Sequence, residues 1–284
     1  MYVNAWPFDG APRTTAPLRQ RAVGRVAFSA ASLSGRTRPA RISESGSMRI
    51  RLPRGEGAGL DAVIVNTAGG IACGDHFTVE IEAQSGTSVT VATPAAEKVY
   101  RSDGPVSALS VSLALGSGAR LDWLPQETLL FDRSRLARRL DVEMAPDARL
   151  TLFEAAVFGR AARAEEVVEG FFEDRWRIRR AERLVYADTL RLAGPVAELL
   201  QKRSVASGAR TLATLIHVAP DAESRLEGAR HCLASGNGCD AAASAWNGLL
   251  AVRFCAVSVE ALRAAVCPFL LSFRGEPLPR VWLS

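Results

Sequence analysis

A strand–turn–strand unit recurs three times in the first two thirds of the chain and constrains the fold more than any other feature. In each copy, a strand with apolar residues at every second position leads through a short turn into a second such strand. The copies span residues 77–91, 109–123 and 140–152, and they start about 30 residues apart. Repeats of this length predict stacked β units, as in a solenoid or a layered β structure. Such a stack offers long surfaces without an obvious single pocket, which favours a binding scaffold over an enzyme.

The 284-residue chain changes character after this repeat. Residues 1–20, rich in Pro, Arg and Thr, are typical of a loose leader, and residues 21–193 form the repetitive β body. Residues 194–284 predict a smaller α/β portion packed on the same core. The expected fold class is mainly β, a layered, helix-like stack of β-strands with this α/β portion at the C-terminus.

Local signals divide the C-terminal portion further. Pro195 at a first helical position, Asp221 as a cap and Ser258 as a cap each predict the start of a helix. The expected elements are a helix over 195–205, a strand over 211–218, a helix from 221 to about 234, a strand over 249–257, a helix over 259–271 and an extended tail over 277–284.

Composition excludes several classes of protein. No stretch approaches the roughly 20 apolar residues that span a bilayer, and residues 1–10 lack the features of a secretory signal. We therefore expect a cytoplasmic protein without a membrane partner. The five cysteines are odd in number and have no CxxC spacing, so a disulfide framework is not expected.

The net charge of +5 and the pI of about 9.2 raise the question of nucleic acid binding. The densest arginine runs, over 133–139 and 175–183, are interleaved with acidic and apolar residues at strand-like spacing. A basic patch attracts any polyanion and is not by itself evidence for a nucleic acid site. We therefore expect no nucleic acid partner.

Four further segments are specific in sequence but do not form a recognisable catalytic motif. They are Asn66–Asp75, Thr93–Ser102, Trp123–Asp132 and the closing Pro279–Trp282. Their order resembles that of the UreD family (also called UreH) of urease accessory proteins, and the resemblance extends from about residue 24 to the C-terminus.

The resemblance implies a mainly β, helix-like layered fold with a few α-helices and no enzymatic activity. It implies a urease maturation factor that binds the urease apoprotein and recruits UreF, and through UreF the GTPase UreG. Nickel would pass along a water-filled path, so we expect transient Ni²⁺ and no tightly bound cofactor. By analogy, the helical C-terminal portion is the expected side for UreF.

Two alternatives stay open from the residues. One is a β-repeat interaction module unrelated to nickel, and the other is an uncharacterised enzyme, for which the sequence shows no set of nucleophile, base and electrophile.

Gly69, Gly70 and Gly74 give the first of the four segments two possible roles. Glycine-rich loops cradle phosphate when a helix follows, but here an alternating strand begins at His76. We favour positive φ angles in a tight crossing between strands, with a partner-binding role for the segment as a whole.

Cys73 and His76 have a C-x-x-H spacing that suits nickel through thiolate and imidazole. The family commonly has glycine and often arginine at these two positions, which argues against an essential site. His231, Cys232 and Cys239 form another group of metal-ligand types, but they lack the fourth ligand of a structural zinc site. His217 lies in an apolar strand and is expected in the core.

The second segment brings together Lys98, Tyr100 and Arg101. In a strand, Glu97, Val99 and Arg101 share one face, and Lys98 and Tyr100 share the other. A role in strand register and a role in partner binding are both consistent with this pattern.

The candidate residues for the nickel path are Asp75, Glu127 and Asp132. Glu127 and Asp132 are hard oxygen ligands that flank an apolar run, and Asp75 belongs to the first segment. The alternative is that Glu127 satisfies a turn at Pro125 and that Asp132 caps the next turn.

Overall fold

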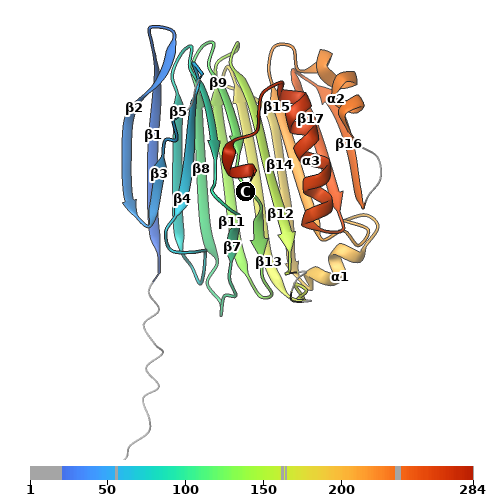
Figure 1. The fold of residues 1–284 in the computed structure, drawn as a ribbon. Coiled ribbons are helices and arrows are strands. Elements are labelled where there is room, and N and C mark those ends of the chain that lie inside the picture. Colours follow the sequence, from blue (N-terminus) through green and yellow to red (C-terminus); the bar gives the residue numbers. More distant parts are fainter. Residues whose placement is uncertain (1–20, 55–56, 161–162, 164, 234–237, 284) are drawn as a thin grey trace, which may run out of the picture.

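Two β-sheets lie face to face, and the chain progresses from one end of this stack to the other (Figure 1). The structure is a computed structural model that describes residues 21–54, 57–160, 163, 165–233 and 238–283. The expected leader over residues 1–20 lies outside the described residues. The expected mainly β layered stack is confirmed.

The first sheet has seven strands among the described residues. Its five inner strands are parallel to one another, and only the two edge pairings, β1 with β2 and β13 with β14, are antiparallel. In spatial order the strands are β14 (Arg183–Gly194), β13 (Gly170–Arg180), β11 (Arg135–Met144), β8 (Ser107–Leu115), β5 (His76–Ala83), β1 (Val23–Leu33) and β2 (Arg36–Gly46).

The second sheet has ten strands in the described part of the chain. Along its main path they are β16 (Cys239–Trp246), β17 (Leu249–Ala256), β15 (Thr211–Val218), β12 (Arg149–Phe158), β9 (Arg120–Leu124), β6 (Ser88–Ala92), β4 (Leu60–Asn66) and β3 (Met48–Arg51). Two short strands, β7 (Glu97–Val99) and β10 (Thr128–Leu130), lie off this path, and β10 pairs in parallel with both β7 and β12.

The repeat in the sequence accounts for this arrangement. Its three copies are β5–β6, β8–β9 and β11–β12, and each sends its first strand into the first sheet and its second strand into the second sheet. A third contact line follows, because Ile71 bridges Val99, Val99 pairs with Leu130, and Leu130 pairs with Phe158, all in parallel. Successive coils of the chain therefore stack in register on three lines.

Buried and exposed side chains alternate along the strands, and the buried ones fill the space between the sheets. In β11, for example, Leu136, Leu140 and Val142 point inward and are almost completely buried, whereas Arg139 is exposed. Each buried Leu or Val side chain contributes about 1.5–3 kcal/mol to folding. Apolar burial between the sheets therefore holds the coils together.

The C-terminal portion extends the second sheet beyond β12 with three antiparallel strands, β15, β17 and β16. It also carries α1 (Val196–Gln201), η2 (Glu223–Arg225), α2 (Leu226–Cys232), α3 (Val259–Arg274) and η3 (Arg280–Trp282). Helix α3 lies over this end of the second sheet (Figure 1), where Phe269 packs against Phe254 with ring centroids 5.7 Å apart.

Several local expectations for this portion are confirmed and others are wrong. The Ser258 Oγ accepts a hydrogen bond from the Ala261 N–H and caps α3, as expected. Asp221 does not cap a helix, because its carboxylate pairs with Arg149 at 2.6 Å. Strand β16 was not anticipated, because the alanines of residues 241–243 carry little β signal.

The expectation of an extended tail is also wrong. The last residues fold into η3, and the Trp282 side chain is buried against the second sheet. The indole N–H of Trp282 donates to the Leu124 carbonyl at 2.9 Å, and its ring packs against Phe153. The Trp282 side chain thus anchors the end of the chain to β9 and β12.

None of the helices in the described ranges has the length and apolarity that crossing a membrane would require.

We predict that Trp282→Ala lowers the free energy of unfolding by about 3–5 kcal/mol, because it leaves a cavity and an unpaired buried carbonyl. Urea unfolding of the full chain measures this change. The matched control is Leu283→Ala, since the Leu283 side chain is 75% exposed, and we expect an effect below about 0.5 kcal/mol. Equal losses for the two variants would show that the Trp282 anchor has no special weight.

Candidate functional site

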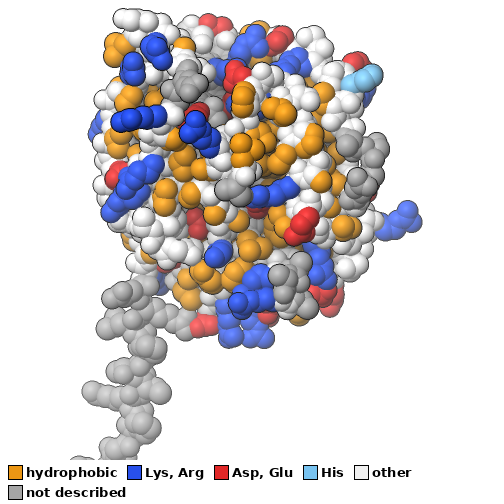
Figure 2. Space-filling model, in the orientation of Figure 1, with side chains coloured by type: hydrophobic (Ala, Val, Ile, Leu, Met, Phe, Trp, Pro, Cys, Tyr) orange, Lys and Arg blue, Asp and Glu red, His pale blue; other side chains and the backbone are white. Residues whose placement is uncertain are grey.

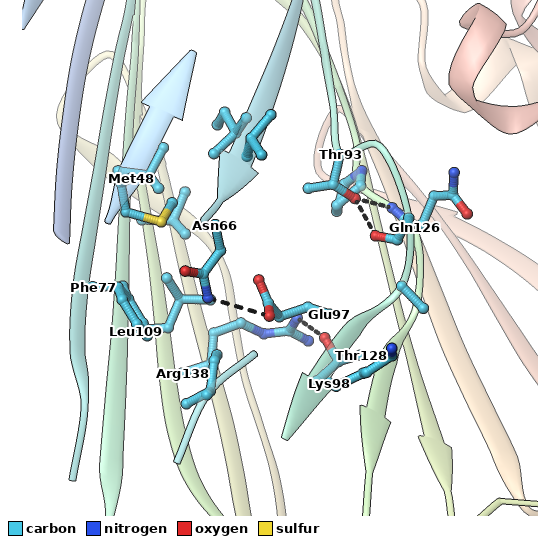
Figure 3. A pocket seen from close by; sticks show the side chains of 18 of the residues that line it. Met48, Asn66, Phe77, Thr93, Glu97, Lys98, Leu109, Gln126, Thr128 and Arg138 are labelled. Atoms are coloured by element: carbon cyan, nitrogen blue, oxygen red, sulfur yellow. Dashed lines mark hydrogen bonds between the residues drawn. The ribbon is translucent and has the colours of Figure 1, made fainter. Parts of the chain in front are cut away.

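A cavity of about 210 Å³ lies between the two sheets (Figure 3). Three of the four segments that resemble the UreD family, here called the family-like segments, meet at this cavity. The lining includes Asn66 at the end of β4, Glu97 in β7, Thr128 in β10 and Arg138 in β11. Apolar residues such as Phe77 form much of the remaining wall. The site is therefore a mostly apolar chamber with a small number of charged and amide groups.

In-register stacking brings these polar residues together. Glu97 and Thr128 are directly paired in the β7–β10 ladder. The Asn66 side-chain amide donates to the Gly70 carbonyl at 3.1 Å and to the Glu97 carboxylate at 3.3 Å. Arg138 donates to the Thr128 hydroxyl at 3.1 Å. Residues about 30 positions apart thus become neighbours, because each occupies the same place in its own coil.

Glu97 is the unusual group in the cavity. Its carboxylate forms no salt bridge with any described residue, although it is largely enclosed. Burial raises the pKa of Glu97 to about 7, and the Asn66 amide, a backbone hydrogen bond at Lys98 and the Lys98 charge only partly oppose this rise. Near neutral pH, this carboxyl group can therefore take up or release a proton without a large change in free energy.

A buried ion cluster forms the inner end of the cavity. Arg138 donates to the Asp174 carboxylate, with Nε 2.9 Å from Oδ1, and to the Glu154 carboxylate. The Trp123 indole N–H donates to Glu154 at 2.9 Å. One guanidinium thus serves two carboxylates, and burial raises the pKa of Glu154 to about 7 against the opposing effect of Arg138.

A second, smaller pocket continues from this cluster. It shares Arg138 and Glu154 with the main cavity and extends to Tyr186 and Asp188 of β14. The Tyr186 hydroxyl donates to Asp188 at 3.0 Å, and Asp188 pairs with the exposed Arg253 at 2.6 Å. Polar groups therefore run from the chamber at Glu97 toward the edge of the first sheet.

The three carboxylates predicted for the nickel path are not brought together by the fold. Asp75 accepts hydrogen bonds from the backbone N–H groups of Ala22 at 2.7 Å and Ala72 at 2.8 Å, before β5 in the first sheet. Glu127 and Asp132 lie at opposite ends of β10. None of the three lines the cavity.

Asp132 contacts a backbone N–H, as the alternative role in capping a turn predicts, whereas Glu127 pairs with an arginine side chain. Glu127 is buried and paired with Arg263 of α3, with Oε1 2.7 Å from Nε and Oε2 3.0 Å from Nη2. Asp132 accepts a hydrogen bond from the Glu169 N–H at 3.1 Å and lies 3.8 Å from Arg133. Their role toward a metal stays a prediction.

The glycines of the first segment adopt positive φ angles, as predicted, at +79° for Gly69, +147° for Gly70 and +85° for Gly74. A Cβ at Gly70 would lie 2.3 Å from the Tyr100 ring and 2.8 Å from the Lys98 carbonyl. Strand β5 follows the loop directly, so no helix N-terminus is present to hold a phosphate.

In the second segment, strand β7 ends at Val99. The side chains of Lys98 and Arg101 are exposed, and Tyr100 packs edge-on against Phe131 while its hydroxyl donates to the Gly69 carbonyl at 3.2 Å. Glu97 and Val99 lie within β7, whereas Arg101, predicted to share their face, lies beyond the end of this strand.

Cys73 and His76 lie near the same loop. The Cys73 thiol is 3.6 Å from the Arg101 carbonyl, and His76 is exposed at the start of β5. Among the described residues, no group of three or more His, Cys, Asp or Glu side chains is placed to hold a metal ion. His231 is exposed and Cys232 half-buried at the end of α2, while Cys239 is buried in β16.

The residues that sequence reasoning missed are Arg138, Glu154 and Asp174, and Glu97 was assigned only to a strand face. The sequence does mark Arg138 and Asp174, because each charged residue occupies a strand position at which the alternation predicts a buried apolar side chain. Arg138 stands between Leu136 and Leu140, and Asp174 between Phe172 and Trp176. Glu154 interrupts an apolar run in β12. Charges at such positions are almost always paired with each other.

We predict that Glu97→Gln changes the pH dependence of stability. The pKa of Glu97 is raised from 4.5 to about 7 in the folded state, so between these pH values folding of the wild type requires proton uptake. The stability of the wild type relative to the Glu97→Gln variant is fully present below pH 4.5 and is lost as pH rises through 7, by at most about 3 kcal/mol. Urea unfolding at pH 4.5 and at about pH 8 measures the difference, and a constant difference would contradict the assignment.

Comparison with known proteins identifies the family. The sequence profile of the family described as "UreD urease accessory protein" matches residues 20–283. A urease accessory protein UreD of Azorhizobium caulinodans is 53% identical over 267 residues, covering 94% of this chain and 98% of that protein. The UreD proteins of Xanthobacter autotrophicus and Methylobacterium sp. (strain 4-46) are each 55% identical, covering 94% and 95% of this chain and 92% and 98% of their own lengths. The chain therefore belongs to the UreD family of urease accessory proteins.

Proposed function

We propose that this chain is a cytoplasmic urease maturation factor that binds the urease apoprotein, recruits UreF and, through UreF, UreG, and acts as a nickel-insertion chaperone. It catalyses no reaction in this proposal, and Ni²⁺ is its transient cargo. The single observation that supports the nickel role most is the cavity at Glu97, which three of the four segments that resemble the UreD family line together.

The chemistry of the cavity suits transit better than storage. Its lining contains neither Cys nor His, so the nitrogen and thiolate ligands that bind nickel tightly are absent from that lining. The carboxylate of Glu97 and the hydroxyl of Thr128 are weaker ligands. Asn66 turns its amide NH2 group toward Glu97, while its amide oxygen accepts from the Ala68 N–H. A carboxyl with a pKa of about 7 can exchange its proton for a metal ion and then release that ion.

Charge at the inner end of the cavity supports the same proposal. Glu97, Glu154 and Asp174 supply three carboxyl groups, against the buried guanidinium of Arg138 and the exposed ammonium of Lys98, which also lines the cavity. This excess of acid attracts a cation, and the guanidinium prevents two carboxylates from closing on the ion as a tight chelate.

Asp75, Glu127 and Asp132 remain candidates for the approach to the cavity. The Asp132 side chain is 31% exposed, whereas that of Glu127 is 3% exposed. Asp132 is therefore the more accessible of these two to an incoming ion.

For the partners, we propose that α3 faces UreF. Figure 2 shows apolar side chains spread over the middle of the face that carries α3, with basic side chains gathered around them. The Leu271 side chain of α3 is 50% exposed. Apolar surface of this kind is a common feature of protein interfaces.

The nickel proposal is tested by co-expressing the full chain with the urease subunits, UreF and UreG and measuring nickel-dependent urease activation. We expect Glu97→Gln to reduce activation about tenfold or more while leaving co-purification intact, which corresponds to at least about 1.4 kcal/mol. Glu82→Gln on the outer face of β5 is the matched control, because its side chain is exposed. Glu127→Ala and Asp132→Ala test the two other carboxylates in the same assay.

Full activation by the Glu97→Gln variant would exclude Glu97 from the nickel path. Failure of the wild type to capture either partner would contradict the scaffold role itself.

The UreF proposal is tested separately with Leu271→Glu. We expect loss of UreF co-purification with urease binding retained, because a charge would be buried at the interface. Leu33→Glu at the distant β1–β2 turn, where the side chain is 61% exposed, is the control. Unchanged UreF capture by the Leu271→Glu variant would remove α3 from this interface.

A further inference from the structure

A separate pocket, of about 290 Å³, shares no lining residue with the cavity at Glu97. Six residues line it, namely Arg120, Arg149, Thr151, His217, Arg225 and Arg274. Four of these six side chains are guanidinium groups. No family-like segment contributes to this lining, and the proposed function makes no use of it.

The pocket forms where separate parts of the fold converge. Arg120 begins β9, Arg149 begins β12, His217 lies near the end of β15, Arg225 ends η2, and Arg274 ends α3. The β body and the C-terminal portion therefore both contribute walls. Thr151, His217 and Arg274 are buried and form the floor, while Arg120 and Arg149 are partly open to solvent.

The acidic partners do not neutralise this cluster. Asp122 pairs with Arg120 and Arg274, Glu276 pairs with the same two arginines, and Asp221 pairs with Arg149. Three carboxylates thus face four guanidinium groups, which leaves one positive charge in excess.

Arg225 carries this excess. It forms no salt bridge with any residue that the structure describes; its two hydrogen bonds go to the His217 ring at 3.2 Å and to the Phe273 carbonyl. Its guanidinium also lies over the Phe273 ring, 3.9 Å from the centroid. Burial, together with the charges of Arg149 and Arg120, lowers the pKa of Arg225 against the opposing effect of Asp221. The pocket thus has a net positive charge that a bound anion would balance.

His217 strengthens this conclusion. Because Arg225 can only donate, the Nε2 atom of His217 accepts from Arg225, and Nδ1 carries the proton that is donated to the Thr151 hydroxyl at 3.2 Å. Burial and the nearby Arg225 charge lower the pKa of His217 to about 4, so the ring is neutral. It orients Arg225 without cancelling its charge.

Donor groups remain available on Arg149 and Arg225. A guanidinium has five N–H donors, of which Arg149 uses one and Arg225 uses two in hydrogen bonds with described residues. Planar guanidinium groups with free N–H pairs bind tetrahedral oxyanions through paired hydrogen bonds.

We propose that this pocket binds a small free oxyanion of the phosphate or sulfate type, held by Arg225 and Arg149 above the Thr151–His217 floor. Its volume suits one such anion with a few water molecules, and its enclosed floor does not suit a polymer backbone. Because α3 and η2 meet the β body here, a bound anion also fastens the C-terminal portion to the second sheet.

The test is a titration of the full chain with inorganic phosphate, with thermal unfolding and calorimetry as readouts. We expect a saturable rise in the unfolding midpoint that sodium chloride at equal ionic strength does not reproduce. Arg225→Gln and Arg149→Gln should each weaken phosphate binding about tenfold or more. Arg179→Gln is the matched control, since Arg179 is a similarly exposed arginine paired with Glu143 on the first sheet, and it should leave binding unchanged.

Asp221→Asn provides a test of opposite sign. This substitution frees Arg149 from its partner, so phosphate should bind more tightly to the Asp221→Asn variant than to the wild type. If the four arginines serve only to hold the fold, this variant loses stability and gains no affinity. That result, a response to chloride equal to the response to phosphate, or unchanged binding in both glutamine variants would overturn the proposal.

Discussion

Parallel pairing of successive coils in register is the constraint on which the rest of the structure depends. It requires that neighbouring strands keep their register, because a slip of one residue would turn every inward side chain to the outer face. The loops absorb differences in coil length, since paired residues lie 53 positions apart between β1 and β5 (Val23 with His76) and 29 apart between β8 and β11 (Ser107 with Leu136). The same pairing places Asn66, Glu97 and Thr128 side by side although they come from three different coils. The chamber between the sheets is therefore a product of the repeat.

The ion cluster around Arg138 shows the cost of keeping polar groups in such a core. A single guanidinium with two carboxylates contributes little net stability compared with apolar residues of the same size, because all three groups have lost their water. Removing Arg138 alone would leave two buried carboxyl groups without their shared partner. The three groups therefore depend on one another.

Much of the fold was accessible from the sequence because alternation with a period of two is a local signal. The turn-linked strand pairs, the β15 span and the Ser258 cap all follow from residues that lie close together. The burial of Trp282 and the ion pairs of Glu127 and Asp221 depend on residues 72 or more positions away in the sequence. No local pattern specifies such contacts. The inward phase of Arg138 was readable, but which acid would meet it was not.

The antiparallel strands at both edges of the first sheet have a consequence for assembly. A parallel stack with two open edges would be a template for further copies of itself and would grow into a fibre. Here β2 and β14 reverse direction, and the edge strand β2 contains Arg36, Arg38, Pro39 and Arg41. Charged side chains and a proline without an N–H make poor partners for another strand. The reversed strands therefore end the parallel stack at both edges of the first sheet.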